Sequence, residues 1–121
     1  MLATGVGSTQ SALVGTTFPI RLAVTVTDAE KNPIADAQVT FSASTRGASG
    51  RFTVHSRDPH HRRSHVSHSY TVKVKTDACG IAVAPAFTAN HLPGGYIVMA
   101  TVKPARPVAF ALVNEAPGQS R

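Results

Sequence analysis

The chain has 121 residues, of which 42% are hydrophobic, and a formal net charge of +6. This length and hydrophobic content fit one domain with its own core, which excludes a globally disordered chain. No apolar run approaches the roughly 20 residues of a membrane helix, so the sequence predicts no membrane span. Cys79 is the only cysteine, which excludes a disulfide within the chain. We predict that Cys79 is a small residue at a turn; the alternative is an exposed thiol that links two chains.

The N-terminal residues 1–8 are rich in Gly and Thr, which predicts a flexible segment. The same residues lack both the charged region and the apolar region of a signal peptide. Three interpretations stay open. The chain is cytosolic, or its export signal is not encoded here, or a leader was removed and Met1 was added.

Residues 20–43 carry the clearest strand signal in the chain. On both sides of a polar centre, β-branched and aromatic residues alternate with polar ones, which indicates strands with one buried face. Asp28, Asn32 and Pro33 in that centre break strands and initiate turns. We therefore predict a hairpin of two strands over this stretch.

Further strands and turns alternate along the rest of the chain. The same pattern predicts strands at residues 9–14, 51–54, 70–75, 81–89, 96–103 and 108–112. Pro85 lacks an amide hydrogen, so it predicts an edge, a bulge or a bend in its strand. The inward residues expected to form the core are Val24, Val39, Phe41, Val72, Val83, Val98 and Phe110. About seven or eight short strands without an amphipathic helix indicate an all-β fold, an antiparallel β-sandwich.

The segment 55–68 departs from this alternation. It holds five of the six histidines, one proline and dense positive charge. Because it shows no sustained apolar periodicity, we predict a long exposed loop that is mobile on its own.

The histidines of this segment raise the question of a metal site. His61, His65 and His68 would share one face of a helix, with His60 adjacent, and neutral imidazoles bind zinc, copper or nickel. However, two arginines between them oppose a cation, and no Asp or Cys completes the set at ligand spacing. We favour a solvated loop without a bound metal.

The same segment could attract polyanions. Its arginines, together with histidines that gain charge below about pH 6.5, make a local positive field. No aromatic residue interleaves the basic ones, so no specific nucleic-acid site is indicated. If the domain has a contact surface, we predict it at Arg57, His60, His61, Arg62, Arg63, His65 and His68.

No catalytic motif is present in the sequence. The nucleophile elbow G-x-S-x-G, the P-loop and the zinc motif H-E-x-x-H are all absent. Asp28 and Asp36, with Asn32, could contact a calcium ion, but turn initiation explains these residues better. We expect no enzymatic activity, no catalytic residue, no cofactor and no specific metal.

Several blocks of the chain resemble a known family. In order they read VTVTDAEKNPIADAQVTFSAST, GASGRFT, KTDACGIAVAPAFTAN, GGYIVMATV and FALVN, and they span roughly residues 10–114. Their order and spacing are similar to those of bacterial immunoglobulin-like domains of the invasin/intimin (Big-1) type. Three features depart from the usual pattern: Lys31 stands where Gly is frequent, Cys79 stands where a small polar residue is common, and the segment 55–68 is longer and more basic.

The resemblance implies an immunoglobulin-like Greek-key β-sandwich over residues 9–114, between a flexible segment 1–8 and a tail or linker 115–121. It implies a non-enzymatic module of a bacterial surface or secreted protein with a structural or adhesive role, and hence an extracellular location. The implied partner is a host or cell-surface ligand, with anionic glycans as a candidate class, and the domain is expected to be a monomer. The alternative is a polyanion- or carbohydrate-binding domain that acts through the segment 55–68.

Overall fold

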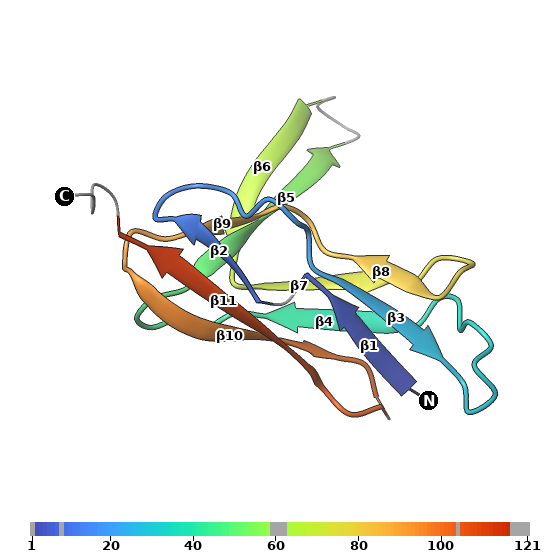
Figure 1. Ribbon diagram of the computed structural model, residues 1–121. Helices are drawn as coiled ribbons and strands as arrows, with labels where there is room; N and C mark the ends of the chain where they lie inside the picture. Colours follow the sequence, from blue (N-terminus) through green and yellow to red (C-terminus); the bar gives the residue numbers. More distant parts are fainter. Residues whose placement is uncertain (1, 8, 59–62, 104, 117–121) are drawn as a thin grey trace.

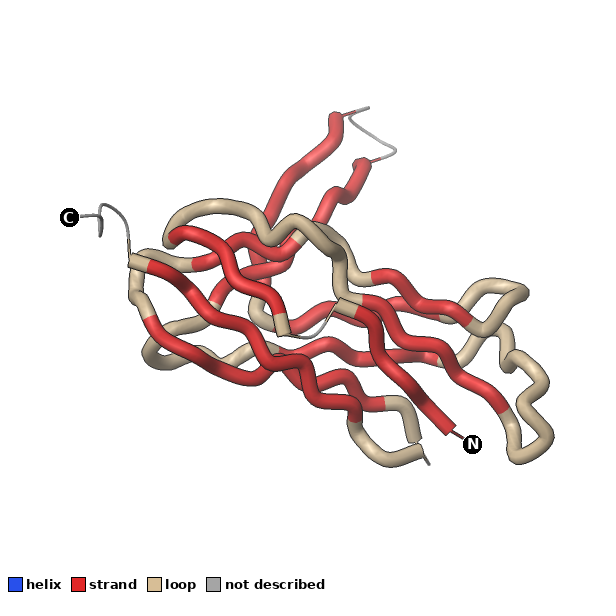
Figure 2. The backbone as a smooth tube through the Cα atoms, in the orientation of Figure 1, coloured by secondary structure: helices blue, strands red, loops and turns tan. Residues whose placement is uncertain are grey.

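The computed structural model describes residues 2–7, 9–58, 63–103 and 105–116. Over these ranges the chain forms eleven β-strands and no helix, as the backbone trace shows (Figure 2). Accordingly, the described residues include no helix that could cross a membrane. The predicted all-β class is confirmed.

One layer of the fold is a five-stranded sheet. Its strand order is β2 (Gln10–Leu13), β11 (Val108–Glu115), β10 (Gly94–Thr101), β4 (Gln38–Ser42) and β7 (Thr71–Lys75). All neighbours run antiparallel except β2 and β11, which are parallel. Successive side chains point to opposite faces, so Val98 and Phe110 are buried whereas Ile97 and Met99 are exposed.

The second layer combines two three-stranded sheets. One has the order β1 (Leu2–Val6), β3 (Ala23–Thr27) and β8 (Ile81–Val83), and the other β6 (Arg63–Ser69), β5 (Gly50–Asp58) and β9 (Phe87–Ala89). The two sheets meet around residues 84–86, where the Ala84 amide donates to Leu22 O and the Thr53 amide donates to Ala86 O. The result is a β-sandwich, with the hairpin of β5 and β6 extending away from its body (Figure 1).

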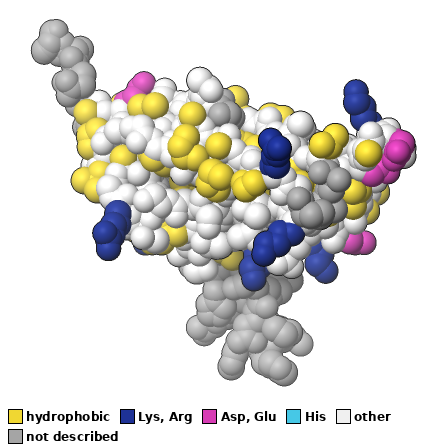
Figure 3. Space-filling view, turned by 90° about the horizontal axis from the view of Figure 1, so that it is seen from below, with side chains coloured by type: hydrophobic (Ala, Val, Ile, Leu, Met, Phe, Trp, Pro, Cys, Tyr) yellow, Lys and Arg dark blue, Asp and Glu magenta, His cyan; other side chains and the backbone are white. Residues whose placement is uncertain are grey.

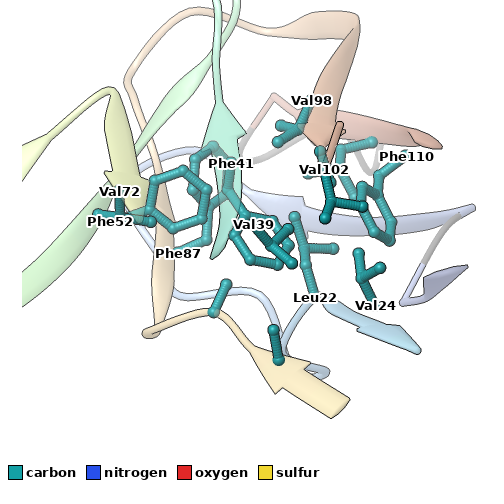
Figure 4. Packing of buried hydrophobic residues seen from close by; sticks show 14 of the residues in the cluster. Leu22, Val24, Val39, Phe41, Phe52, Val72, Phe87, Val98, Val102 and Phe110 are labelled. Atoms are coloured by element: carbon teal, nitrogen blue, oxygen red, sulfur yellow. The ribbon is translucent and has the colours of Figure 1, made fainter. Parts of the chain in front are cut away.

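The core lies between the two layers. All five phenylalanines of the chain are linked ring to ring, with centroid separations from 4.7 to 6.3 Å. Valines and Leu22 fill the space around these rings (Figure 4). Each fully buried large side chain stabilises the fold by about 1.5–3 kcal/mol, so the core supplies the stability that no disulfide provides.

Six of the seven predicted core residues are buried, and Val83 is the exception at 48% exposure. Its neighbours Ala82 and Ala84 are fully buried instead. Both alanines fit where the two sheets of the second layer meet, and the larger Val83 faces outward. The prediction placed the larger residue inside, and an error of one residue reverses the faces of a strand.

The predicted hairpin over residues 20–43 is wrong in its pairing. Its two strands, β3 and β4, belong to different layers, and β3 pairs with β1 and β8 rather than with β4. The polar turn is present, and it carries the chain across the sandwich. The alternation could not distinguish the two arrangements, because two strands that face each other across a core show the same pattern as two paired strands.

The N-terminal segment 1–8 also differs from the prediction. Residues Leu2–Val6 form β1, which pairs with β3 over five residue pairs. Gly7, at φ 109°, then turns the chain toward the five-stranded sheet, where it continues as β2. A side chain at Gly7 would be strained by this φ and would lie 3.0 Å from Leu22 Cδ2.

The segment 55–68 contains strands rather than one long loop. Seven residue pairs join β5 and β6, from Phe52–Ser69 to Asp58–Arg63. Phe52 and Val54 at its root belong to or pack against the core, but the rest of the hairpin is mostly polar. Backbone hydrogen bonds pair polar residues as well as apolar ones, so this part of the sequence gave no alternation signal. The second strand of this hairpin, the additional strand β1 and the break at Pro85 raise the number of strands in the described ranges above the predicted seven or eight. At the C-terminus, β11 extends to Glu115, and residues 117–121 of the predicted tail lie outside the described residues.

Candidate functional site

A hollow of about 230 Å³ lies at the root of the hairpin of β5 and β6. Three of its lining residues carry basic side chains: Arg51, His68 and His91. The remaining lining residues are small or polar: Gly15, Thr88, Ala89 and Asn90. These residues come from four separate parts of the chain, and the second layer brings them together.

The sheet β6-β5-β9 positions the first of the basic side chains. Arg51 of β5 is directly opposite Thr88 of β9, and its guanidinium carbon lies 5.7 Å from the centroid of the Tyr70 ring. A guanidinium at this distance from an aromatic face is attracted to it, which favours one position for a long side chain. The Thr88 hydroxyl is hydrogen-bonded to that of Thr17 at 3.0 Å.

His91 is positioned by a loop that a buried asparagine holds. The Nδ2 of Asn114 donates to Asn90 Oδ1 at 3.0 Å and to Leu92 O at 3.1 Å, on both sides of His91. The Tyr96 hydroxyl donates to Asn114 Oδ1 at 2.8 Å. Burial raises the pKa of Tyr96 far above its ordinary value, so this hydroxyl keeps its proton and remains a donor. The imidazole of His91 covers Gly15, where a Cβ would lie 2.8 Å from His91 Cε1.

The hollow lies away from most of the negative charge. Four acidic residues occupy the turns at the end of the sandwich where β3 finishes and β8 begins: Asp28, Glu30, Asp36 and Asp77. Acidic side chains accordingly gather at the right-hand end of the space-filling view (Figure 3). Glu115 lies nearer the hollow but does not line it. The basic side chains of the hollow therefore have no carboxylate beside them among its lining residues.

Among the predicted contact residues, His68 is the one whose side chain the structure describes, and it lines this hollow. Arg57, Arg63 and His65 lie farther out along the hairpin, opposite Ser64, Asp58 and Ser56 in the strand register. The remaining three, His60, His61 and Arg62, lie outside the described residues. The helical face that would have joined His65 to His68 is absent, because both positions belong to β6.

Sequence reasoning missed the other basic residues of the hollow. Arg51 lies before the histidine-rich segment, and His91 is the one histidine far from it. No local motif links these two residues. Only the pairing of β5 with β9 and the loop after β9 place them at one site.

The next question is whether side chains in the described ranges could bind a metal ion. They contain no group of three or more His, Cys, Asp or Glu side chains that could hold a metal ion. The Oδ1 of Asp28 accepts hydrogen bonds from the amides of Glu30 and Asn32, and its Oδ2 accepts one from the Asn32 side chain. These bonds lower the pKa of Asp28, the backbone bond from Asn32 most strongly. Turn formation thus accounts for this carboxylate. Cys79 lies at a turn, as predicted, and it is also exposed, which the alternative of a thiol that links two chains requires.

Comparison with known proteins gives a likeness of fold. No family model matches the chain, and no curated protein matches it. Among solved structures it is similar to invasin, a bacterial integrin-binding protein, with 24% sequence identity and a TM-score of 0.59. The match covers 94% of this chain but only 18% of the invasin chain. The immunoglobulin-like β-sandwich implied by the sequence resemblance is thereby confirmed as the fold.

Proposed function

We propose that this domain is a non-enzymatic module of a bacterial surface or secreted protein, with a structural or adhesive role. The observation that supports it most is the fold likeness to invasin over 94% of the chain. Since the chain matches only 18% of that protein, the likeness concerns one module of a much longer molecule. The integrin binding of invasin makes a host cell-surface receptor the first class of partner to test.

The positions of the chain ends support a modular role. Leu2 is paired with Thr27, at the end of the sandwich that carries the acidic turns. Glu115 is paired with Leu13 at the opposite end (Figure 1). A chain that enters at one end and leaves at the other allows such domains to follow one another in a row, as a stalk requires.

Small-angle X-ray scattering of two copies fused in tandem through the native tail tests the structural role. We expect an elongated particle about twice as long as the single domain, because the connection joins opposite ends. Two domains packed side by side would contradict the stalk role. Beads coated with the tandem protein, applied to cultured animal cells, test the adhesive role separately, and retention no greater than that of uncoated beads would exclude it.

A second candidate function is the binding of an anionic glycan. The observation that favours it is the hollow, where Arg51, His68 and His91 gather without a carboxylate in the lining. Its volume suits one sulfate or carboxylate with part of its sugar ring rather than a whole chain.

Nuclear magnetic resonance titration with a heparin-derived oligosaccharide tests this second function. At about 0.15 M salt, where long-range attraction is largely screened, we expect saturable shifts at the hollow. Arg51→Gln should weaken binding several-fold, whereas Lys73→Gln, on the exposed face of β7, removes the same charge away from the hollow and should have little effect. Equal losses in both variants would show nonspecific attraction to net charge and reject the site.

A further inference from the structure

We infer that the domain resists mechanical tension along its long axis, and that the parallel pair of β2 and β11 is the element that resists it. This is a function of the isolated domain, so it holds whether or not the proposed adhesion does. It follows from three features: the direction of these two strands, the positions of the chain ends, and the bonds that anchor β2.

The pair of β2 and β11 joins the first and last parts of the chain directly. Four residue pairs form it, from Gln10–Leu112 to Leu13–Glu115. Two further backbone bonds lie beside these pairs: the Thr9 amide donates to Ala111 O at 2.8 Å, and the Val14 amide donates to Glu115 O at 3.0 Å. Because the strands are parallel, both run toward the end of the sandwich where Glu115 lies.

Tension on the chain ends pulls these two strands past each other. The N-terminal end of the chain leaves beside Thr27, and the C-terminal end leaves beside Leu13, at opposite ends of the sandwich. The force therefore acts along the strands and across the hydrogen bonds between them. All bonds of the pair are then loaded together and must break together. A force applied across the strands would break them one at a time.

Additional bonds pass the tension from β1 into this pair. The side chain of Gln10 holds the chain after Gly7 in place: its Nε2 donates to Gly7 O and to Ile20 O, both at 2.7 Å. The Ile20 amide donates back to Gln10 Oε1 at 3.2 Å. Before β2 is loaded, the five pairs of β1 with β3 must also slide, since β1 lies along the same axis. The N-terminal part of the chain is thus fixed to both layers.

The single native cysteine allows a direct test by optical tweezers. In the first geometry, handles on the two chain ends pull along the axis. In the second, one handle is on the N-terminus and the other on Cys79, which is exposed and lies in the turn next to Val26, at the same end of the sandwich as Leu2. This second geometry pulls β1 sideways from β3, beginning at Leu2. We expect the unfolding force to be several-fold higher in the first geometry, and equal forces would overturn the inference.

A substitution in the pair of β2 and β11 tests whether this pair is the element that resists the tension. Val14→Pro removes the amide that donates to Glu115 O. It should lower the force clearly in the first geometry and little in the second. Val72→Ala in β7 is the matched control, because it weakens the core without touching β2 or β11. If Val72→Ala, at an equal loss of equilibrium stability, lowers the axial force as much as Val14→Pro does, resistance comes from global stability and the inference fails.

Discussion

Two turns at the same end of the domain follow one hydrogen-bond pattern. In each, an aspartate Oδ1 accepts bonds from the amides of the second and fourth residues after it, at 2.9 and 2.8 Å for Asp28 and at 2.9 and 3.0 Å for Asp77. The third residue, Lys31 or Gly80, has a positive φ of 68° or 77° and donates its amide to the aspartate carbonyl. The two turns differ in what surrounds this third residue.

Lys31 faces solvent, whereas Gly80 is buried beneath the neighbouring turn. A Cβ at Gly80 would lie 2.6 Å from Val26 O and 3.0 Å from Pro33 Cβ. Val26 also donates its amide to Gly80 O at 2.7 Å, so the backbone of one turn supports the other. A lysine can therefore occupy a position with a positive φ. Glycine is necessary only where, as at position 80, close packing leaves no room for a Cβ. This accounts for Lys31 at a position where the resembling family commonly has Gly.

The largest effect is expected from Gly80→Ala. The substitution combines a strained φ with a clash against backbone, and it should lower the free energy of unfolding by about 2–4 kcal/mol. Urea denaturation measures this loss. Gly47→Ala is the control, since Gly47 has a φ of 66° but no atom within 4 Å of its Cβ position. A loss at Gly80 no larger than that at Gly47 would refute the role of packing.

Removal of the aspartate from each turn should have the next largest effect. Asp77→Ala leaves the amides of Cys79 and Ile81 without their acceptor and should cost about 1–2 kcal/mol. Asp28→Ala should cost less, because the third residue of its turn, Lys31, faces solvent, whereas the turn of Asp77 holds the buried Gly80 against the backbone of Val26. Chemical denaturation of both variants gives the comparison. A greater loss at Asp28 would show that the exposed turn is the more important one.

Acid should weaken the turn of Asp28. Its carboxyl pKa is lowered in the folded domain from an ordinary value of 3.8, mainly by the backbone bond from Asn32. The stabilisation is therefore present above about pH 4 and is lost as the pH falls through the folded pKa. Asp28→Asn removes this titration. We expect the stability difference between the parent domain and Asp28→Asn to shrink as denaturation is repeated at decreasing pH, and a constant difference would contradict the assignment.

The smallest effect is expected from Lys31→Gly. Glycine relieves the cost of a positive φ but loses more entropy on folding, so a net stabilisation of at most about 1 kcal/mol should remain. The melting temperature should rise slightly. A fall would mean that the Lys31 side chain makes a favourable contact that exceeds the backbone strain.

Sequence alternation predicted the fold well wherever one strand face meets the core. Val24, Val39 and Phe41 are fully buried, and the pattern that placed them inside is a direct consequence of the two-residue period of a strand. It failed for Val83, which is 48% exposed. The small residues Ala82 and Ala84 on either side of it are buried instead, and periodicity gives small residues too little weight.

Pairing and sites were harder to predict, because they depend on contacts between distant residues. No feature of the sequence near β3 indicates that this strand pairs with β1 and β8. The hairpin of β5 and β6 depends on backbone bonds that polar residues make as readily as apolar ones. For the same reason, the hollow that joins Arg51 to His91 became visible only with the register of β5 and β9.

The turn at Gly7 has a consequence for how copies of the domain could exchange strands. Because β1 and β2 belong to different layers, one short segment covers an edge of both sheets: β3 on one side and β11 on the other. Release of this segment would expose two unpaired edges at once, and a second molecule could fill both with its own N-terminal segment. Concentrated samples that lack residues 1–13 should therefore associate through these edges, and a peptide of the same sequence should prevent it.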